Sequence, residues 1–147
     1  MLADFITPEL IRLQVPAANW RDAVIQGGEL LEKAGICEPR YVEAMLDAVE
    51  KMGPYMVLAP GIALSHSRPE DGVIKVGMSI ITLATPVEFG SEANDPVRLV
   101  ISFGCVDKTS HIGMLQDLAR FLIVPENQTL LMEASSVEDI MNAFYKT

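Results

Sequence analysis

Apolar residues recur at helical spacing in two stretches of the first third of the chain. The first stretch follows Asn19, whose side chain can cap a helix, and ends at Gly35. The second opens at Pro39, a favourable first helical position, and stops at Gly53. Two amphipathic helices are therefore predicted, and a glycine pair inside the first allows it to pack closely on a neighbour. The apolar faces are Trp20, Ala23, Val24, Leu31 and Ala34 in the first helix, and Tyr41, Ala44, Met45, Ala48, Val49 and Met52 in the second.

Four stretches rich in β-branched and other apolar residues are predicted to form strands. They cover residues 11–15, 62–66, 73–84 and 97–106. The last of these is apolar enough for a strand that is buried on both faces. A loop dense in turn-forming residues, 89–96, separates it from the strand before.

Helical periodicity returns in the last third of the chain. One helix is predicted after Thr109 and Ser110, and a final one begins at a capping box formed by Ser135 and Glu138. Helices that flank a set of strands predict an α/β fold, in which one domain over residues 1–147 has a central mixed sheet covered by helices. The inward-facing residues are expected to be Leu115, Leu118, Ala119 and Leu122 in the first of these helices, and Val137, Ile140, Met141 and Phe144 in the last.

The composition supports one globular domain with a large core. Half of the 147 residues are hydrophobic, and a chain of this length buries roughly 68–70% of its unfolded surface. Cys37 and Cys105 belong to no close pair and no metal-type spacing, so both are expected to be reduced thiols of a cytosolic protein. No signal peptide and no run of about 18 apolar residues is seen, so membrane insertion is not expected.

The charge of the chain narrows the class of partner. A formal net charge of −9 repels nucleic acid, and the sequence has no cluster of lysine and arginine that would bind a phosphate backbone. An acidic cytosolic protein that does not bind nucleic acid is therefore expected.

The most informative short segment of the chain ends in His66. An apolar approach leads to Ser65, His66, Ser67 and Arg68, and a proline-containing turn follows. This order places an imidazole where a rigid strand meets an exposed loop. Because the ordinary pKa of histidine is about 6.5, the ring is largely neutral at pH 7 and can attack phosphorus and hold a phosphoryl group. A purely structural histidine is the alternative that the segment leaves open.

His111 is the only other histidine of the chain and stands at the start of a predicted helix. Free backbone N–H groups and the helix dipole favour an anion at that position. If His111 faces His66, it can donate a hydrogen bond to phosphoryl oxygens, and the hydroxyls of Thr109 and Ser110 can add to it. The alternative is that Thr109 or Ser110 caps the helix and His111 is solvated.

Other chemistries lack the residues they need. Two widely separated histidines without a neighbouring Cys/His cluster do not form a zinc site, and no metal or cofactor is expected. The sequence contains no phosphate-binding Gly-x-x-x-x-Gly-Lys-[Ser/Thr] loop, no Gly-x-Gly-x-x-Gly and no Gly-x-Ser-x-Gly. A histidine that carries a group is the chemistry that remains.

Three segments of the chain resemble one known family. Residues 53–72, the 89–96 loop and residues 107–115 are similar to the IIA component of the bacterial sugar phosphotransferase system. The resemblance is to the mannitol/fructose type, and within it to the branch associated with ascorbate transporters. The stretches that carry it are Gly-Pro-Tyr-Met-Val-Leu-Ala-Pro-Gly-Ile-Ala and Glu-Ala-Asn-Asp-Pro-Val.

The resemblance implies a role for each histidine. The residue at the position of His66 takes a phosphoryl group from the phosphocarrier protein HPr and passes it to a cysteine of the IIB component, while the membrane IIC component translocates the sugar. The residue at the position of His111 assists by hydrogen bonding. The resemblance also implies a five-stranded mixed sheet. A regulatory protein, in which phosphorylation of His66 controls a non-transport partner, is the alternative, and a degenerate domain that only binds is a third.

The chain departs from the family pattern next to its histidine. Ser65 stands where proline is usual and Ser67 where a small residue is usual. Ser65 is expected to add a hydroxyl near the reactive nitrogen. Val49 and Glu50 stand where many members have an arginine late in the preceding helix, and Arg68 is a candidate to replace it.

Partner docking is expected to use an apolar patch with an acidic rim. The candidates for the patch are Met52, Met56 and Leu64, with an ordinary core role as the alternative. The candidates for the rim are Glu70, Asp71, Glu92 and Asp95.

Overall fold

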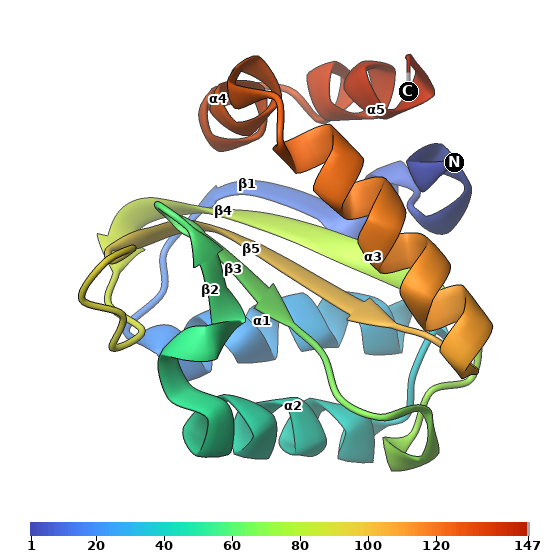
Figure 1. Cartoon of the computed structure of the whole chain (residues 1–147). Coiled ribbons are helices and arrows are strands. Elements are labelled where there is room, and N and C mark those ends of the chain that lie inside the picture. The colour runs from blue at the N-terminus through green and yellow to red at the C-terminus, as the bar shows by residue number, and fades with distance from the viewer. Residues whose placement is uncertain (147) are drawn as a thin grey trace.

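A five-stranded mixed β-sheet forms the centre of the protein, as predicted. A computed structural model of the chain describes residues 1–146, apart from the side chain of Pro54, so the last residue of the predicted domain lies outside this range. The strand order is β1-β4-β5-β3-β2 (Figure 1). Pairing is parallel for β1 with β4 and β3 with β5, and antiparallel for β4 with β5 and β2 with β3. The strands are β1 Ile11–Val15, β2 Val57–Ala59, β3 Ile62–Ser65, β4 Gly77–Val87 and β5 Val97–Gly104.

Helices cover both faces of this sheet. Figure 1 shows α1 and α2 on one face, and α3, α4 and α5 on the other. The helices are α1 Trp20–Lys33, α2 Pro39–Met52, α3 Lys108–Leu122, α4 Pro125–Glu133 and α5 Val137–Tyr145. Short 3₁₀ helices lie at Leu2–Phe5, Pro8–Leu10, Gly53–Met56 and Pro69–Asp71.

The close approach of α1 to the sheet depends on glycine. A Cβ atom on Gly27 would lie 2.5 Å from the Oγ atom of Ser102 on β5, so only a glycine lets the helix sit at this depth. Asn19 caps α1 as predicted, since its side chain accepts a hydrogen bond of 2.9 Å from the backbone N–H of Asp22. The predicted close packing of this helix is confirmed.

Two elements were not predicted. The three-residue strand β2 is too short to show an alternating pattern, and it pairs with β3 at the edge of the sheet. Helix α4 begins at Pro125, and Leu131 is its one buried residue among those described, so no apolar stripe marks it. The strand predicted over residues 73–84 instead spans Gly77–Val87, because residue Val73 pairs with Cys37 in an isolated bridge ahead of β4.

The predicted starts of the last two capped helices were each wrong. Asp107 caps α3 by accepting the N–H of Ser110 at 2.8 Å, so Thr109 and Ser110 lie inside the first turn. Ser136, not Ser135, caps α5, and its hydroxyl accepts the N–H of Asp139. In each case the capping residue must have extended backbone geometry, which spacing in the sequence does not reveal.

The inward face of α3 also differs in part from the prediction. Ala119 is exposed, whereas Met114 and Phe121 are buried together with Leu118 and Leu122. The buried residues form a stripe at i, i+4, i+7 and i+8, and α3 contacts both α4 and the 3₁₀ helix Leu2–Phe5.

Candidate active site

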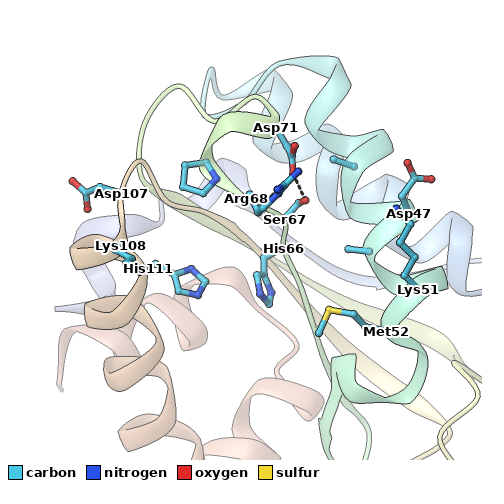
Figure 2. Close-up of a pocket in the computed structure, with 13 residues that line it drawn as sticks. Asp47, Lys51, Met52, His66, Ser67, Arg68, Asp71, Asp107, Lys108 and His111 are labelled. Atoms are coloured by element: carbon cyan, nitrogen blue, oxygen red, sulfur yellow. Dashed lines mark hydrogen bonds and ion pairs between the residues drawn. The ribbon is translucent and has the colours of Figure 1, made fainter.

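The two histidines meet in one cleft at the edge of the sheet. Strands β3 and β5 run parallel, so their carboxyl ends lie at the same edge. His66 follows the last residue of β3, and the chain that leaves β5 turns into α3, which bears His111. The cleft has a volume of about 690 Å³, and the end of α2, the loop after β3 and the first turn of α3 form its walls (Figure 2).

The His66 ring is held against an aromatic side chain from β5. It stacks on Phe103 with ring centroids 4.7 Å apart and an interplanar angle of 18°. Its Nδ1 atom is buried and has no hydrogen-bond partner among residues 1–146. Because His66 lines the cleft while Nδ1 is buried, Nε2 is the nitrogen that a partner can reach.

Burial makes His66 a weak base. Loss of solvation, together with a smaller effect of the nearby His111, lowers the pKa of its imidazole from 6.5 to about 4. The ring is therefore neutral at pH 7, and its lone pair is free for a nucleophilic reaction.

His111 lies in the same site, as the sequence predicts for the case in which the two histidines face each other. Its ring centroid is 5.4 Å from that of His66, at an interplanar angle of 49°, and 5.7 Å from that of Phe103. Its backbone N–H donates to the carbonyl of Asp107, which fixes it in the first turn of α3. A group bound to His66 therefore sits within the reach of the His111 side chain.

Ser65 does not reach the reactive nitrogen, contrary to expectation. Its side chain is buried beneath α2, and its hydroxyl donates to the Sδ atom of Met45 at 3.4 Å. Successive side chains of a strand point to opposite faces, so the hydroxyl of the last strand residue and the ring of His66 diverge.

Ser67 and Arg68 line the cleft and are tied to one carboxylate. The hydroxyl of Ser67 donates to Asp71 Oδ2 at 2.5 Å, and the backbone N–H of Arg68 donates to the same oxygen at 3.1 Å. The Nε atom of Arg68 lies 3.6 Å from Asp71, and the side chain is 76% exposed. These bonds close the loop after His66 and lower the pKa of the Asp71 carboxyl, with the Ser67 hydroxyl as the main cause.

Neither Thr109 nor Ser110 lines the cleft. Thr109 is exposed, and the hydroxyl of Ser110 donates to the carbonyl of Asp107 at 3.1 Å, within the cap of α3. Besides His111, Lys108 of this turn lines the cleft, and so does Lys51 from the last turn of α2. Sequence reasoning missed both lysines, although their place at helix ends next to the site was a usable signal.

Tyr41 is a further residue whose position next to the site was missed. It lies on the predicted apolar stripe of α2, and its hydroxyl contacts the backbone of Ser67 and Phe103. A tyrosine within a buried stripe needs a partner for its hydroxyl, and this requirement was the available signal.

The cysteines offer no second nucleophile. Cys37 and Cys105 are both buried and unpaired. Burial raises the pKa of the Cys37 thiol to about 11 and raises the pKa of the Cys105 thiol as well, so both stay protonated at neutral pH.

Only part of the predicted docking patch and acidic rim lies at the cleft, where Met52 and Asp71 line it. Met56 and Leu64 are core residues, only 2% and 3% exposed, whereas Met52 is 49% exposed and lines the cleft. Glu92 and Asp95 lie in the loop before β5, at the opposite end of the strands from His66. Asp95 accepts N–H groups of its own loop and so has a structural role there.

Residues 1–146 hold neither a metal-binding cluster nor a membrane-spanning helix. No group of three His, Cys, Asp or Glu side chains in this range is placed to hold a metal ion. No helix within it is long and apolar enough to cross a membrane.

Known proteins are similar to this chain in both sequence and fold. The ascorbate-specific PTS system EIIA component of Shigella boydii is 43% identical over 139 residues, which cover 93% of this chain and 90% of that protein. The mannitol-specific cryptic phosphotransferase enzyme IIA of Escherichia coli superposes with a TM-score of 0.87 at 30% identity over the full length of both chains. The Escherichia coli enzyme IIAMTL, solved in complex with phosphorylated enzyme IIBMTL, superposes with a TM-score of 0.84 at 32% identity over 97% of this chain and 98% of that one.

A family match extends over nearly the whole chain. Residues 4–147 match the family described as "Phosphoenolpyruvate-dependent sugar phosphotransferase system, EIIA 2". The five-stranded mixed sheet with its flanking helices is the fold that these relatives share. The chain therefore belongs to the type 2 EIIA family of the phosphoenolpyruvate-dependent sugar phosphotransferase system.

Proposed function

We propose that His66 accepts a phosphoryl group on Nε2 from phosphorylated HPr and passes it to a cysteine of a IIB component. The observation that carries the proposal is the state of His66: a neutral imidazole that stacks on Phe103, with Nδ1 buried and Nε2 facing the cleft. EIIA components are phosphotransferases of this system, and one structural relative is held in a complex with phosphorylated enzyme IIB.

The chemical step is an in-line displacement at phosphorus. The lone pair of Nε2 forms the new P–N bond while the electron pair of the old bond stays on the donor nitrogen. The phosphoryl group arrives already activated, so the work of the protein is to position it and stabilise its charge. The His111 side chain, with its centroid 5.4 Å from that of His66, donates a hydrogen bond to the phosphoryl oxygens.

Three cationic side chains border the place that the phosphoryl group would take. Lys51 approaches from α2, Lys108 from the first turn of α3 and Arg68 from the loop after β3 (Figure 2). Asp71 lies near the Arg68 guanidinium and offsets part of its charge. The cleft lining also carries three carboxylates, those of Asp47, Asp71 and Asp107, so its formal charges balance. In a chain with a net charge of −9, this cleft repels a dianionic group less than the rest of the surface does. The N-terminus of α3 adds the positive end of its dipole.

The substrate of the transport system is proposed from relatives. The similar proteins of Shigella and Escherichia coli are ascorbate-specific EIIA components, with 43% and 41% identity over 139 residues. We therefore assign this chain to an ascorbate-type system, in which a membrane IIC component translocates the substrate. We assign its site of action to the cytoplasm, where reduced thiols such as the unpaired Cys37 and Cys105 are usual.

Labelling from phosphoenolpyruvate tests this function. The protein is incubated with phosphoenolpyruvate, enzyme I and HPr, and the expected product is an acid-labile, base-stable adduct of one phosphoryl group. His66→Ala should abolish the adduct, and His111→Ala should retain it while slowing onward transfer to IIB. Labelling that persists in His66→Ala would overturn the assignment.

A further inference from the structure

The buried hydroxyl of Tyr41 joins the two segments that hold His66. Tyr41 is fully buried on α2. Its hydroxyl accepts the backbone N–H of Ser67 at 2.9 Å and lies 2.7 Å from the backbone carbonyl of Phe103, to which it donates. Ser67 is the residue after His66, and Phe103 supplies the ring on which His66 stacks. One hydroxyl group therefore contacts both the backbone beside the histidine and the strand that bears its stacking partner.

These two hydrogen bonds lie just beyond the point where the hydrogen-bonded pairing of β3 with β5 ends. The register of β3 with β5 ends at the pair Ser65 and Ser102. The next residues along, His66 and Phe103, form no pair in this ladder, and the cleft opens beyond them. The Tyr41 hydroxyl lies between the two separating backbones and satisfies one donor and one acceptor that a continued ladder would have paired. It thereby fixes the spacing of the strands at the mouth of the cleft.

A phenol is suited to this position. Burial raises the pKa of the Tyr41 hydroxyl, so the group keeps its proton and can donate and accept at once. The carbonyl of Ser67 also lies 3.3 Å from the hydroxyl, but the single proton is better directed to the nearer carbonyl of Phe103. Without the hydroxyl, a buried N–H and a buried carbonyl lose their partner.

We propose that Tyr41 is a positioning residue for phosphoryl transfer, which sets the place of the His66 ring against Phe103 by tying Ser67 to β5. This inference rests on the proposed function of His66 and extends it to a residue that touches neither the phosphoryl group nor a partner. Small errors in the position of a nucleophile are costly in rate, since displacements of about 1 Å can slow a reaction by about a hundredfold.

Tyr41→Phe removes both hydrogen bonds and keeps the ring. Ser79→Ala is the matched control, because Ser79 lies on β4 of the same sheet, outside the cleft lining. Its hydroxyl makes one buried hydrogen bond of 2.9 Å, to the carbonyl of Gly27 on α1. Two readouts are compared: the NMR ring-current shifts and NOE contacts between His66 and Phe103, and the single-turnover rate of phosphoryl transfer from HPr at several HPr concentrations.

The expected result separates positioning from a general loss of stability. Tyr41→Phe should lose the His66–Phe103 contacts and slow the saturated transfer step about tenfold or more, with half-saturation by HPr unchanged. Ser79→Ala should change neither readout, even if it lowers the thermal stability as much as Tyr41→Phe does. If Tyr41→Phe matches Ser79→Ala in both readouts, the inference is overturned.

A second variant covers the case in which Tyr41→Phe does not fold. Phe103→Leu keeps the backbone carbonyl that Tyr41 contacts but removes the stacking ring, and it should slow transfer to a similar extent. Transfer at the wild-type rate would overturn the inference. The NMR comparison needs no phosphoryl donor. It therefore tests whether Tyr41 positions His66 against Phe103 even if the wild-type protein is not labelled on His66 and the proposed function fails.

Discussion

The imidazoles of His66 and His111 lie with ring centroids 5.4 Å apart, and Phe103 contacts both rings. The two histidines come from segments that are far apart in the chain, and the parallel pairing of β3 with β5 brings them to one edge of the sheet. A positive charge on His66 is opposed both by burial and by the second imidazole. The arrangement therefore keeps the His66 imidazole neutral at pH 7.

The first consequence is an unusually acidic titration of His66. Its ring resonances should titrate with a pKa of about 4 rather than 6.5. His111→Gln removes the neighbouring imidazole and should raise the pKa of His66, but only part of the way to 6.5, because burial is the larger cause. A ¹H–¹⁵N NMR titration of wild-type and variant measures both values. A His66 pKa near 6.5 in the wild-type protein would contradict the buried position of Nδ1.

The same shift makes stability depend on pH. The folded pKa of His66 is below the unfolded one, so between pH 4 and pH 6.5 the unfolded chain binds more protons. The contribution of His66 is therefore complete above about pH 6.5 and is lost as the pH falls toward 4. It amounts to about 3 kcal/mol across this window.

Urea unfolding at several pH values measures this contribution. His66→Gln carries no titrating group, so the pH dependence of its unfolding free energy should be shallower than that of the wild-type protein between pH 4 and pH 6.5. The carboxyl groups are common to both proteins and cancel in the difference. Equal slopes for the two proteins would show that His66 titrates normally.

Loss of His111 should slow transfer without preventing phosphorylation. His111→Ala removes the side chain that we propose donates to the phosphoryl oxygens, and removal of one such donor typically slows transfer by about a hundredfold. His111→Gln keeps an N–H donor in a side chain of similar reach and should recover part of this loss. Stopped-flow measurement of transfer to IIB gives the rates. Equal rates for His111→Ala and the wild-type protein would place His111 outside the mechanism.

The overall architecture and the choice of His66 and His111 as candidate site residues were predictable from the sequence, because both depend on strong local signals. The helices α1 and α2 have long apolar stripes and clear start signals at Asn19 and Pro39, and the central strand β5 is a nearly continuous apolar run. His66 and His111 are scarce titratable residues at the ends of elements. Each of these features depends on residues that are neighbours in the chain.

The supporting residues of the site were not predictable in the same way, because their partners are distant in sequence. Ser65 was expected next to the reactive nitrogen, but Met45 of α2 takes its hydroxyl instead. The hydroxyl of Tyr41 meets the backbone of Phe103, and only the folded sheet brings the two together. Likewise, the sequence left both a docking role and a core role open for Met56 and Leu64, and the folded sheet shows that both are core residues.

The lysines of the cleft should contribute through their charge. Lys51→Gln and Lys108→Gln each remove one cation from the cleft wall and should slow transfer from HPr about threefold to thirtyfold, with a larger effect at low salt. Lys33→Gln is the matched control, since Lys33 lies at the end of α1 outside the cleft and its loss changes the net charge equally. Transfer rates at about 20 mM and about 500 mM salt, between which the Debye length falls about fivefold, provide the test. An equal effect of all three variants would assign the loss to net charge alone.

Ser65 should prove dispensable for transfer. Its hydroxyl is buried and makes one hydrogen bond to the thioether of Met45, which is a weak acceptor. Ser65→Ala removes that bond and leaves no strong donor or acceptor without a partner, so the free energy of unfolding should fall by no more than about 1 kcal/mol. The rate of transfer through His66 should stay within about twofold of the wild-type rate, because the hydroxyl points away from the ring. Chemical unfolding and stopped-flow transfer measure the two quantities. A large loss of rate at unchanged stability would mean that the hydroxyl reaches the phosphoryl group after all, and that the strand end rearranges when the partner binds.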